Sequence, residues 1–382
     1  MSHIPRPALP GISNAVVMEL SDGRSVYTGV DGSTVNGLFS LAVLNKDMTA
    51  YLSRDFQTVL AAVVGPFQFR GEQALLYSSP VNDGTSVWLV GPYALYRYDV
   101  DSPGTVVEVQ DLPVHNNAVA APHNRERRAP AVAVSGGKLF VAGGSSTTSD
   151  QVTSGNGKNA VTYTGYNQGT QMVSSVVYCT LDGSGGCGAW STLASSLSGD
   201  GRAFMSYCAS GTKLYLVGGR TASWQYRVIQ GQDTSADPFN DAAVPGGQVG
   251  TVEVIDMAGL TIDTSYGSLP VSLEWGDYGS DGANLGTIGT GSRSHCAIKS
   301  STLYVAGGGN SAGVSEKVYA MDLDASSSNY KTFYEVAGVT LPAAEYGFRA
   351  TAHVTNAAGG KLLIYSSGAS TAAASLDVSV AA

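Results

Sequence analysis

The sequence predicts an all-β fold in which one small antiparallel unit is used repeatedly. The first indication is a short apolar strand that ends in two glycines and occurs at residues 138–144, 213–219 and 302–308. The second is the regular recurrence of Gly, Ser, Asn and Asp turns between short apolar runs, which is typical of strands joined by tight turns. No convincing helix is found. A repeat of this kind indicates stacked units that share one continuous core.

Taken in order, the chain divides into a terminal segment and six units. Residues 1–13 are Pro-rich and are predicted to be either an extended arm or a strand that closes the last sheet. Residues 14–382 are predicted to be a single domain. Its expected strands lie at 14–20, 25–29, 40–45 and 49–52; at 73–78, 86–91, 94–99 and 105–109; at 129–134, 138–144, 174–182 and 190–193; at 203–209, 213–219, 251–257 and near Tyr266; at 294–299, 302–308, 317–323 and 331–336; and at 350–355, 361–365 and 375–380.

An aspartate marks the third expected strand of five units, where its side chain suits the start of a turn. These residues are Asp99, Asp182, Asp256, Asp322 and Asp377. Together with the Gly-Gly strands and Trp190, they give the chain, from about residue 14 onward, a pattern that resembles the kelch family of β-propellers. The resemblance implies a six-bladed β-propeller with expanded loops on one face. It implies no particular activity, because many functions share this scaffold.

Four segments are longer than a kelch unit needs: 145–173, 220–250, 270–292 and 112–127. In an antiparallel blade, the loop between strands two and three lies on the same face as the connection to the next blade, so all four are expected on one face. The segments are rich in side chains that binding surfaces favour. These are Tyr163, Tyr166, Trp224, Tyr226, Arg227, Trp275 and Tyr278. Packing of the loops against themselves is the alternative reading.

An arginine recurs just before the first strand of a unit, at Arg70, Arg128, Arg202, Arg293 and Arg349. The family resemblance implies that such arginines stand near the channel mouth, where a guanidinium group can bind a carboxylate through two hydrogen bonds. A structural role, in which they brace neighbouring loops, is equally open. We therefore treat the five arginines and the loop aromatics as candidate ligand-binding residues.

Composition narrows the classes of partner. The formal net charge is −9 and only 13% of the residues are charged, so nucleic acid is not expected as a partner. No apolar run is long enough to span a membrane, and the first ten residues lack the pattern of a secretory signal. A cytoplasmic protein or a component of a virion or other particle is expected. Cys179 and Cys187 flank a predicted hairpin turn and are either bonded or free, whereas Cys208 and Cys296 are expected to be small core residues.

The sequence favours a non-enzymatic binding or structural module that presents its expanded face to a protein or a glycan. No catalytic residue, metal site or cofactor is predicted. The alternative is a carbohydrate-active enzyme similar to kelch sialic-acid mutarotases, which needs acid and base groups beside the arginines. Candidate acids on the expanded face are Glu126, Glu274, Asp277, Asp281 and Glu345, and His115 and His123 lie in the 112–127 connection. A histidine–carboxylate pair in an open pocket would favour the enzyme.

Overall fold

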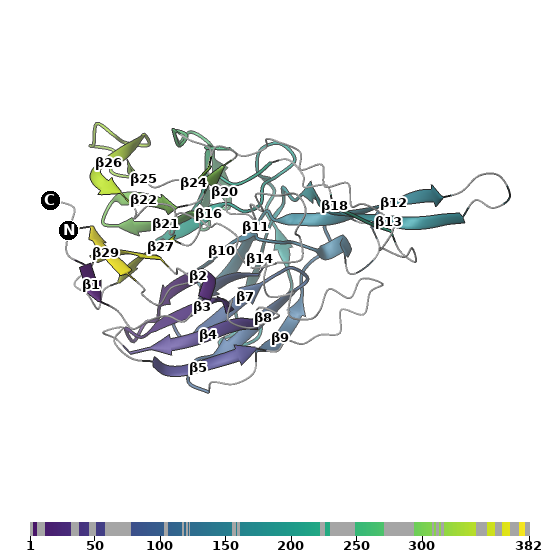
Figure 1. Cartoon of the computed structure of the whole chain (residues 1–382), viewed down its shortest axis with the longest axis horizontal. Helices are drawn as coiled ribbons and strands as arrows, with labels where there is room; N and C mark the ends of the chain where they lie inside the picture. Colours follow the sequence, from purple (N-terminus) through teal and green to yellow (C-terminus); the bar gives the residue numbers. More distant parts are fainter. Residues whose placement is uncertain are drawn as a thin grey trace.

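Short antiparallel sheets built from strands that follow one another along the chain make up an all-β propeller (Figure 1). The computed structural model describes residues 3–5, 12–31, 38–45, 51–57, 78–102, 106–116, 118–119, 121, 123–154, 158, 161–221, 226–229, 249–270, 294–307, 309–310, 313–314, 317–340, 350–355, 361–366 and 374–378. Within these residues the 3-10 helix η1 (His123–Arg125) is the one helix, in agreement with the all-β prediction.

Five four-stranded sheets are each built by one stretch of chain. The first contains β2 (Ile12–Glu19), β3 (Ser25–Asp31), β4 (Leu38–Leu44) and β5 (Tyr51–Gln57). The second contains β6 (Ser79–Asn82), β7 (Ser86–Val90), β8 (Ala94–Asp99) and β9 (Val107–Asp111). The third contains β10 (Ala131–Ser135), β11 (Lys138–Ala142), β14 (Val176–Thr180) and β15 (Ser191–Thr192). The fourth contains β16 (Ser206–Ser210), β17 (Lys213–Val217), β19 (Val252–Asp256) and β20 (Thr261–Asp263). The fifth contains β21 (Ser294–Lys299), β22 (Thr302–Gly307), β25 (Lys317–Asp322) and β26 (Phe333–Thr340).

A further four-stranded sheet combines the two ends of the chain. It contains β27 (Ala350–Thr355), β28 (Lys361–Ser366) and β29 (Ala374–Val378), and β1 (His3–Pro5) pairs with β29 at its edge. The expectation of six blades is corrected accordingly. Five blades are complete within one stretch of chain, whereas the last unit supplies only three strands and depends on β1 for the fourth.

The first strands of the sheets place the sheets side by side. Strand β2 contacts β6, β6 contacts β10, and β10 contacts β16; β16 then contacts β21, β21 contacts β27, and β27 contacts β2. The sheets therefore follow one another around a closed ring. Strand β6 begins at Ser79, which pairs with Val90, and residues 73–77 of the strand expected at 73–78 lie outside the described residues.

The core lies between neighbouring sheets. Successive side chains of a strand point to opposite faces of its sheet, so each strand contributes to the two clusters on either side of it. In β7, Val87 and Leu89 pack into the cluster shared with the first sheet, whereas Trp88 and Val90 pack into the cluster shared with the third. Strands β11 and β17 divide their side chains between two clusters in the same way. Because both faces of each sheet are covered, these strands have continuous apolar sequences. Each fully buried side chain contributes roughly 1.5–3 kcal/mol to folding.

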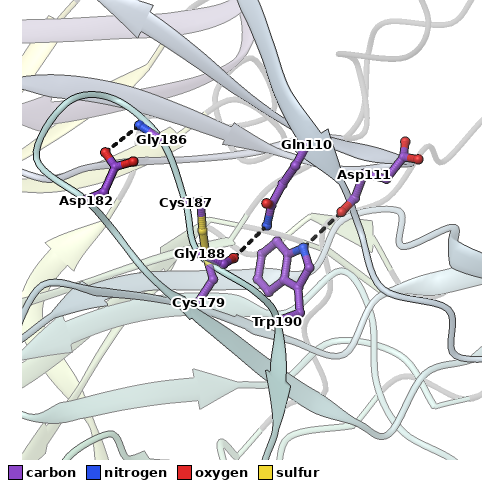
Figure 2. Close-up of a disulfide and its surroundings, with 8 residues drawn as sticks. All are labelled: Gln110, Asp111, Cys179, Asp182, Gly186, Cys187, Gly188 and Trp190. Atoms are coloured by element: carbon purple, nitrogen blue, oxygen red, sulfur yellow. Dashed lines mark hydrogen bonds between the residues drawn. A yellow bond between two sulfur atoms is a disulfide. The ribbon is translucent and has the colours of Figure 1, made fainter.

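Turns after the third strands follow the aspartate pattern. Asp99 accepts hydrogen bonds from the amides of Asp101 and Ser102, and Asp256 accepts them from those of Ala258 and Gly259. Asp182 does the same in the hairpin that follows β14, where Gly186 donates to its carboxylate (Figure 2). The predicted role of these aspartates is therefore confirmed for the three turns.

The same hairpin is closed by a disulfide between Cys179 and Cys187, whose Cα atoms are 6.0 Å apart. This answers the question that the sequence left open for these two cysteines. Just beyond the disulfide, the indole of Trp190 donates to the carbonyl oxygen of Asp111 at 2.9 Å, which ties the third sheet to the second (Figure 2).

Candidate functional site: an arm formed by two insertions

Two of the predicted insertions meet in one additional sheet. Strands β12 (Ser145–Ser154) and β13 (Val161–Met172) form a long antiparallel ribbon, and β18 (Tyr226–Ile229) from the second insertion pairs with β13. In Figure 1 the ribbon extends away from the propeller sheets. We call β12, β13 and β18 the arm. A smaller pair, β23 (Gly309–Asn310) and β24 (Gly313–Val314), follows β22.

The register of the arm assigns the predicted residues to two faces, since directly opposed residues lie on the same face. Tyr166 is opposite Val228, and Tyr226 is opposite Gln168, two positions along β13 from Tyr166. Tyr166 and Tyr226 therefore share one face. Arg227 is opposite Asn167, and Tyr163 lies four positions from Asn167 on the same strand, so these two share the other face.

The arm is polar and nearly uncharged in composition. Most residues of β12 and β13 are Ser, Thr, Asn, Gln, Gly or Tyr, and Asp150 is the only charged residue in the two strands. Edge strands usually carry charges that prevent pairing with other chains, yet β12 is an edge strand with a single charge. Tyrosine, serine, glycine and asparagine are also the residues that antibody binding loops use.

The base of the arm is fixed to the connection between the second and third sheets. The amide of Arg128 donates to the carbonyl of Ser145 at 2.8 Å, and the amide of Ser145 donates back at 2.9 Å. The side-chain amide of Asn116 donates to Gln171 Oε1 at 2.7 Å, and η1 contacts β12. Thus the described parts of segments 145–173, 220–250 and 112–127 contact one another, whereas residues 222–225, 230–248 and 271–292 lie outside the described residues.

A cluster of polar side chains is buried beside this base. Glu126 is fully buried, and it accepts hydrogen bonds from Tyr93 Oη at 3.2 Å and from Arg128 Nε. His123 Nδ1 lies 3.3 Å from Glu126 Oε2 and 3.4 Å from Tyr93 Oη. Tyr93, His123 and Arg128 are only 6%, 5% and 8% exposed. The negative charge of Glu126 is thus balanced inside the protein by the guanidinium group of Arg128.

Burial also sets the protonation of groups around the cluster. Desolvation, reinforced by the charge of Glu126, raises the pKa of Tyr93 far above its usual value, so this hydroxyl is a donor at neutral pH. Burial and the nearby charge of Arg127 lower the pKa of His115 to about 4. Its Nε2 lies 2.7 Å from the carbonyl oxygen of Glu126, so neutral His115 donates to that oxygen. A histidine–carboxylate pair therefore exists at His123 and Glu126, but it is enclosed rather than open.

Of the five arginines that precede first strands, Arg128 and Arg202 lie in the described part of the chain, and both are buried and bonded to protein groups. Arg202, 3% exposed, donates to the carbonyl oxygens of Gly218 and Thr251 at 3.2 and 2.9 Å. It also forms an ion pair with Glu253, whose Oε2 lies 3.1 Å from Nη2. Arg128 is bonded to Glu126. Both arginines thus make contacts of the bracing kind, and ligand binding by them stays a prediction.

The residue that corresponds to Arg202 in the third sheet is Arg127, not Arg128. Arg127 donates to the carbonyl oxygens of Gly143 and Ser175 at 3.1 and 3.0 Å and to the Ser175 hydroxyl at 2.7 Å. Gly143 and Gly218 are each sixteen residues beyond their arginine. Burial lowers the pKa of Arg127 to about 10.

The remaining predicted ligand-binding residues lie outside the described residues: Arg70, Arg293, Arg349, Trp224, Trp275 and Tyr278. Sequence reasoning also missed Tyr93 as a partner of the 112–127 connection. The one sequence signal for the buried cluster was the three-residue spacing between His123 and Glu126. Within the described ranges, no group of three or more His, Cys, Asp or Glu side chains has the geometry of a metal site. Nor does that part of the chain contain a helix long and apolar enough to cross a membrane.

Comparisons with known proteins give one distant structural likeness and no family. No family model matches the chain, and no curated protein matches it. Among the solved structures that match is one titled "Structure of YjhT", with 15% identity and a TM-score of 0.45 over 76% of this chain and 72% of that chain. The kelch resemblance noted in the sequence is therefore not confirmed at the level of a family.

Proposed function

We propose that the protein is a non-enzymatic binding module whose arm contacts a glycan or a protein partner. One observation carries the proposal: insertions into two different blades pair into a single sheet, through β13 and β18. The backbone of this sheet extends beyond what the propeller needs for its core. Ordering such segments has an entropic cost, and extra length in a compact domain is usually retained for function.

The residues of the arm suit recognition of hydroxyl-rich or backbone-rich surfaces. Ser, Thr, Asn and Gln side chains offer neutral donors and acceptors, and tyrosine rings combine an apolar face with a hydroxyl group. Because β12 and β13 contain one charged residue and β18 contains one more, Arg227, the recognition is expected to depend only weakly on salt. A place on the surface of a virion or another assembly, or in the cytoplasm, is compatible with this role, and neither location is distinguished by it.

The two faces of the arm give a matched experiment. The labelled protein is applied to a glycan array and to candidate partner proteins, together with the double variant Tyr166→Ala/Tyr226→Ala and the double variant Tyr163→Ala/Arg227→Ala. Loss of binding by tenfold or more in one double variant only, with unchanged thermal stability in both, is the expected result. Binding that is absent in the wild type, or equal in all three proteins, contradicts the proposal.

A carbohydrate-active enzyme is the second candidate, because His123 and Glu126 form a histidine–carboxylate pair beside Arg128 and Tyr93. An enzyme of this kind must bring the pair into contact with a sugar, although all four residues are at most 8% exposed. Nuclear magnetic resonance of sialic acid tests the candidate. Acceleration of anomer exchange by the wild type, lost in Glu126→Gln, would favour the enzyme over the binding module.

We also infer that the sheet shared by the chain ends closes the gap between the first and the fifth blades. The support is that β27 contacts both β21 and β2, the first strands on either side of it. Removal of residues 1–5 should then open the ring and lower the thermal midpoint, whereas an equal midpoint would show that β1 contributes no closing strand.

A further inference from the structure

Two cysteines stand on neighbouring first strands. Cys208 is the third residue of β16 in the fourth sheet, and Cys296 is the third residue of β21 in the fifth. Strands β16 and β21 contact each other directly. Both cysteines are free thiols in this structure.

The two side chains also share one apolar cluster. This cluster fills the space between the fourth and fifth sheets and contains Tyr215 and Val254 from one and Val305 and Tyr319 from the other. Cys296 is a buried member at 7% exposure, and Cys208 packs against the cluster while remaining partly exposed. The Cys208 thiol is close enough to Cys296 to form a side-chain hydrogen bond with it.

We propose that Cys208 and Cys296 are a redox site, and that their oxidation forms a disulfide that cross-links the fourth and fifth sheets. The chain already holds one disulfide within the third sheet, between Cys179 and Cys187. An environment that maintains that bond supplies oxidising equivalents for a second one. The Cys208–Cys296 bond differs in that it joins separate sheets and encloses the second insertion, with β18, in its loop.

The difference in exposure sets the order of the chemistry. Burial, together with the neighbouring Cys208, raises the pKa of Cys296 well above its usual value, so Cys296 is a poor first nucleophile. The thiolate of the partly exposed Cys208 attacks a low-molecular-weight disulfide, RSSR, and releases one RS⁻, which takes up the proton lost by Cys208. Cys296 then loses its proton and displaces the second RS⁻ from Cys208 Sγ. In total, two protons and two electrons pass from the cysteines to RSSR, which leaves as two RSH.

The cross-link should act mainly on the unfolded chain. It would close a loop of 296 − 208 = 88 residues, and disulfides that close long loops restrict the unfolded ensemble most. We expect the thermal midpoint of the full chain to rise by roughly 5 °C on oxidation.

Peptide mapping tests the proposal directly. The full-length protein is reduced, incubated with oxidised glutathione over a range of ratios to reduced glutathione, alkylated with N-ethylmaleimide and digested with trypsin without reductant. Trypsin releases Cys208 in residues 203–213 and Cys296 in residues 294–299, whereas Cys179 and Cys187 share residues 159–202. The expected product is a cross-linked pair of the first two peptides, accompanied by the rise in thermal midpoint.

Two variants separate this bond from the other disulfide. In Cys179→Ala/Cys187→Ala the cross-link and the oxidation-dependent rise should persist. In Cys208→Ser, at a partly exposed position that should tolerate the change, the cross-link should disappear and the rise should shrink to the part that the Cys179–Cys187 bond supplies. The proposal is overturned if Cys208 and Cys296 remain alkylated or become separately glutathionylated under conditions that fully form the Cys179–Cys187 bond. It is equally overturned if the midpoint shift is the same in wild type and Cys208→Ser.

Discussion

Replacing Arg202 by methionine distinguishes a bracing arginine from a ligand-binding one. In the wild type the guanidinium group is 3% exposed and bonded to two carbonyl groups and to Glu253, which is itself 2% exposed. Methionine fills a similar volume but donates no hydrogen bond. The variant therefore keeps the packing while it leaves the buried carboxylate without its cation.

The magnitude follows from those contacts. Breaking a buried ion pair by removing one partner costs about 3–5 kcal/mol. The carbonyl of Gly218 also loses its donor, which adds about 1 kcal/mol, whereas the carbonyl of Thr251 keeps the amide of Gly218 at 3.0 Å. We expect Arg202→Met to lose about 4–6 kcal/mol of unfolding free energy, a large share of the roughly 5–15 kcal/mol typical of native proteins. Arg202→Met/Glu253→Gln should recover about 2 kcal/mol, because no buried charge then lacks a partner.

Urea denaturation, followed by tryptophan fluorescence, measures these differences. The control is Arg24→Met, which removes surface pairs to Asp22 and to Asp101, the latter 70% exposed, and should change stability by at most about 1 kcal/mol. Arg202→Lys provides a milder change if the methionine variant does not fold. A loss below about 1 kcal/mol in Arg202→Met, combined with loss of ligand binding, would refute the bracing role.

Three further predictions concern the turns, the pH response and the disulfide. Gly143→Ala should lower the free energy of unfolding by about 3–4 kcal/mol in denaturation experiments, because Gly143 has a φ of +67° and an added Cβ would lie 2.2 Å from the Arg202 carbonyl oxygen. The control Gly136→Ala, with open space around a φ of +57°, should cost about 1 kcal/mol, and equal costs would contradict the close approach at Gly143. The folded pKa of His115, about 4, lies below its unfolded value of 6.5, so its contribution to stability is present above pH 6.5 and is lost as the pH falls toward 4. Denaturation midpoints at intervals across that window should fall less steeply in His115→Gln, and an unchanged slope would show that His115 is not the group responsible. Cys179→Ala/Cys187→Ala should lose about 2–3 kcal/mol, since the bond closes a loop with a sequence separation of only 8, and a loss above about 5 kcal/mol would point to a native-state role instead.

The repeated sheets could be predicted from the sequence because their cause is local. In Lys138–Ala142, four consecutive apolar residues follow the lysine, and the structure buries all four between two neighbouring sheets. The role of the turn aspartates is equally local, since each carboxylate accepts hydrogen bonds from backbone amides two to four residues further along the chain.

The candidate site was only partly predictable, because its contacts join distant segments. The two insertions were recognised by their length, but the pairing of Tyr166 with Val228 depends on a register between strands from different blades. Tyr93 and Glu126 are separated by 33 residues, and neither lies in a sequence motif from which their contact could be predicted. The adjacent residues Arg127 and Arg128 also made it difficult to recognise which arginine corresponds to Arg202. Sequence spacing favoured Arg128, whereas the sixteen-residue interval to the first glycine of each Gly-Gly pair identifies Arg127.

Arg127 and Arg128 together fix the base of the arm. Arg127 is held by Gly143 and Ser175, which flank the insertion that forms β12 and β13. Arg128, the next residue, pairs through its backbone with Ser145, the first residue of β12. The arm therefore starts from a position that the propeller core defines through consecutive residues, one by its side chain and one by its backbone. A surface that is positioned before its partner arrives loses less conformational entropy on binding. If the arm binds a partner as proposed, the buried arginines would therefore favour that binding without contacting the ligand.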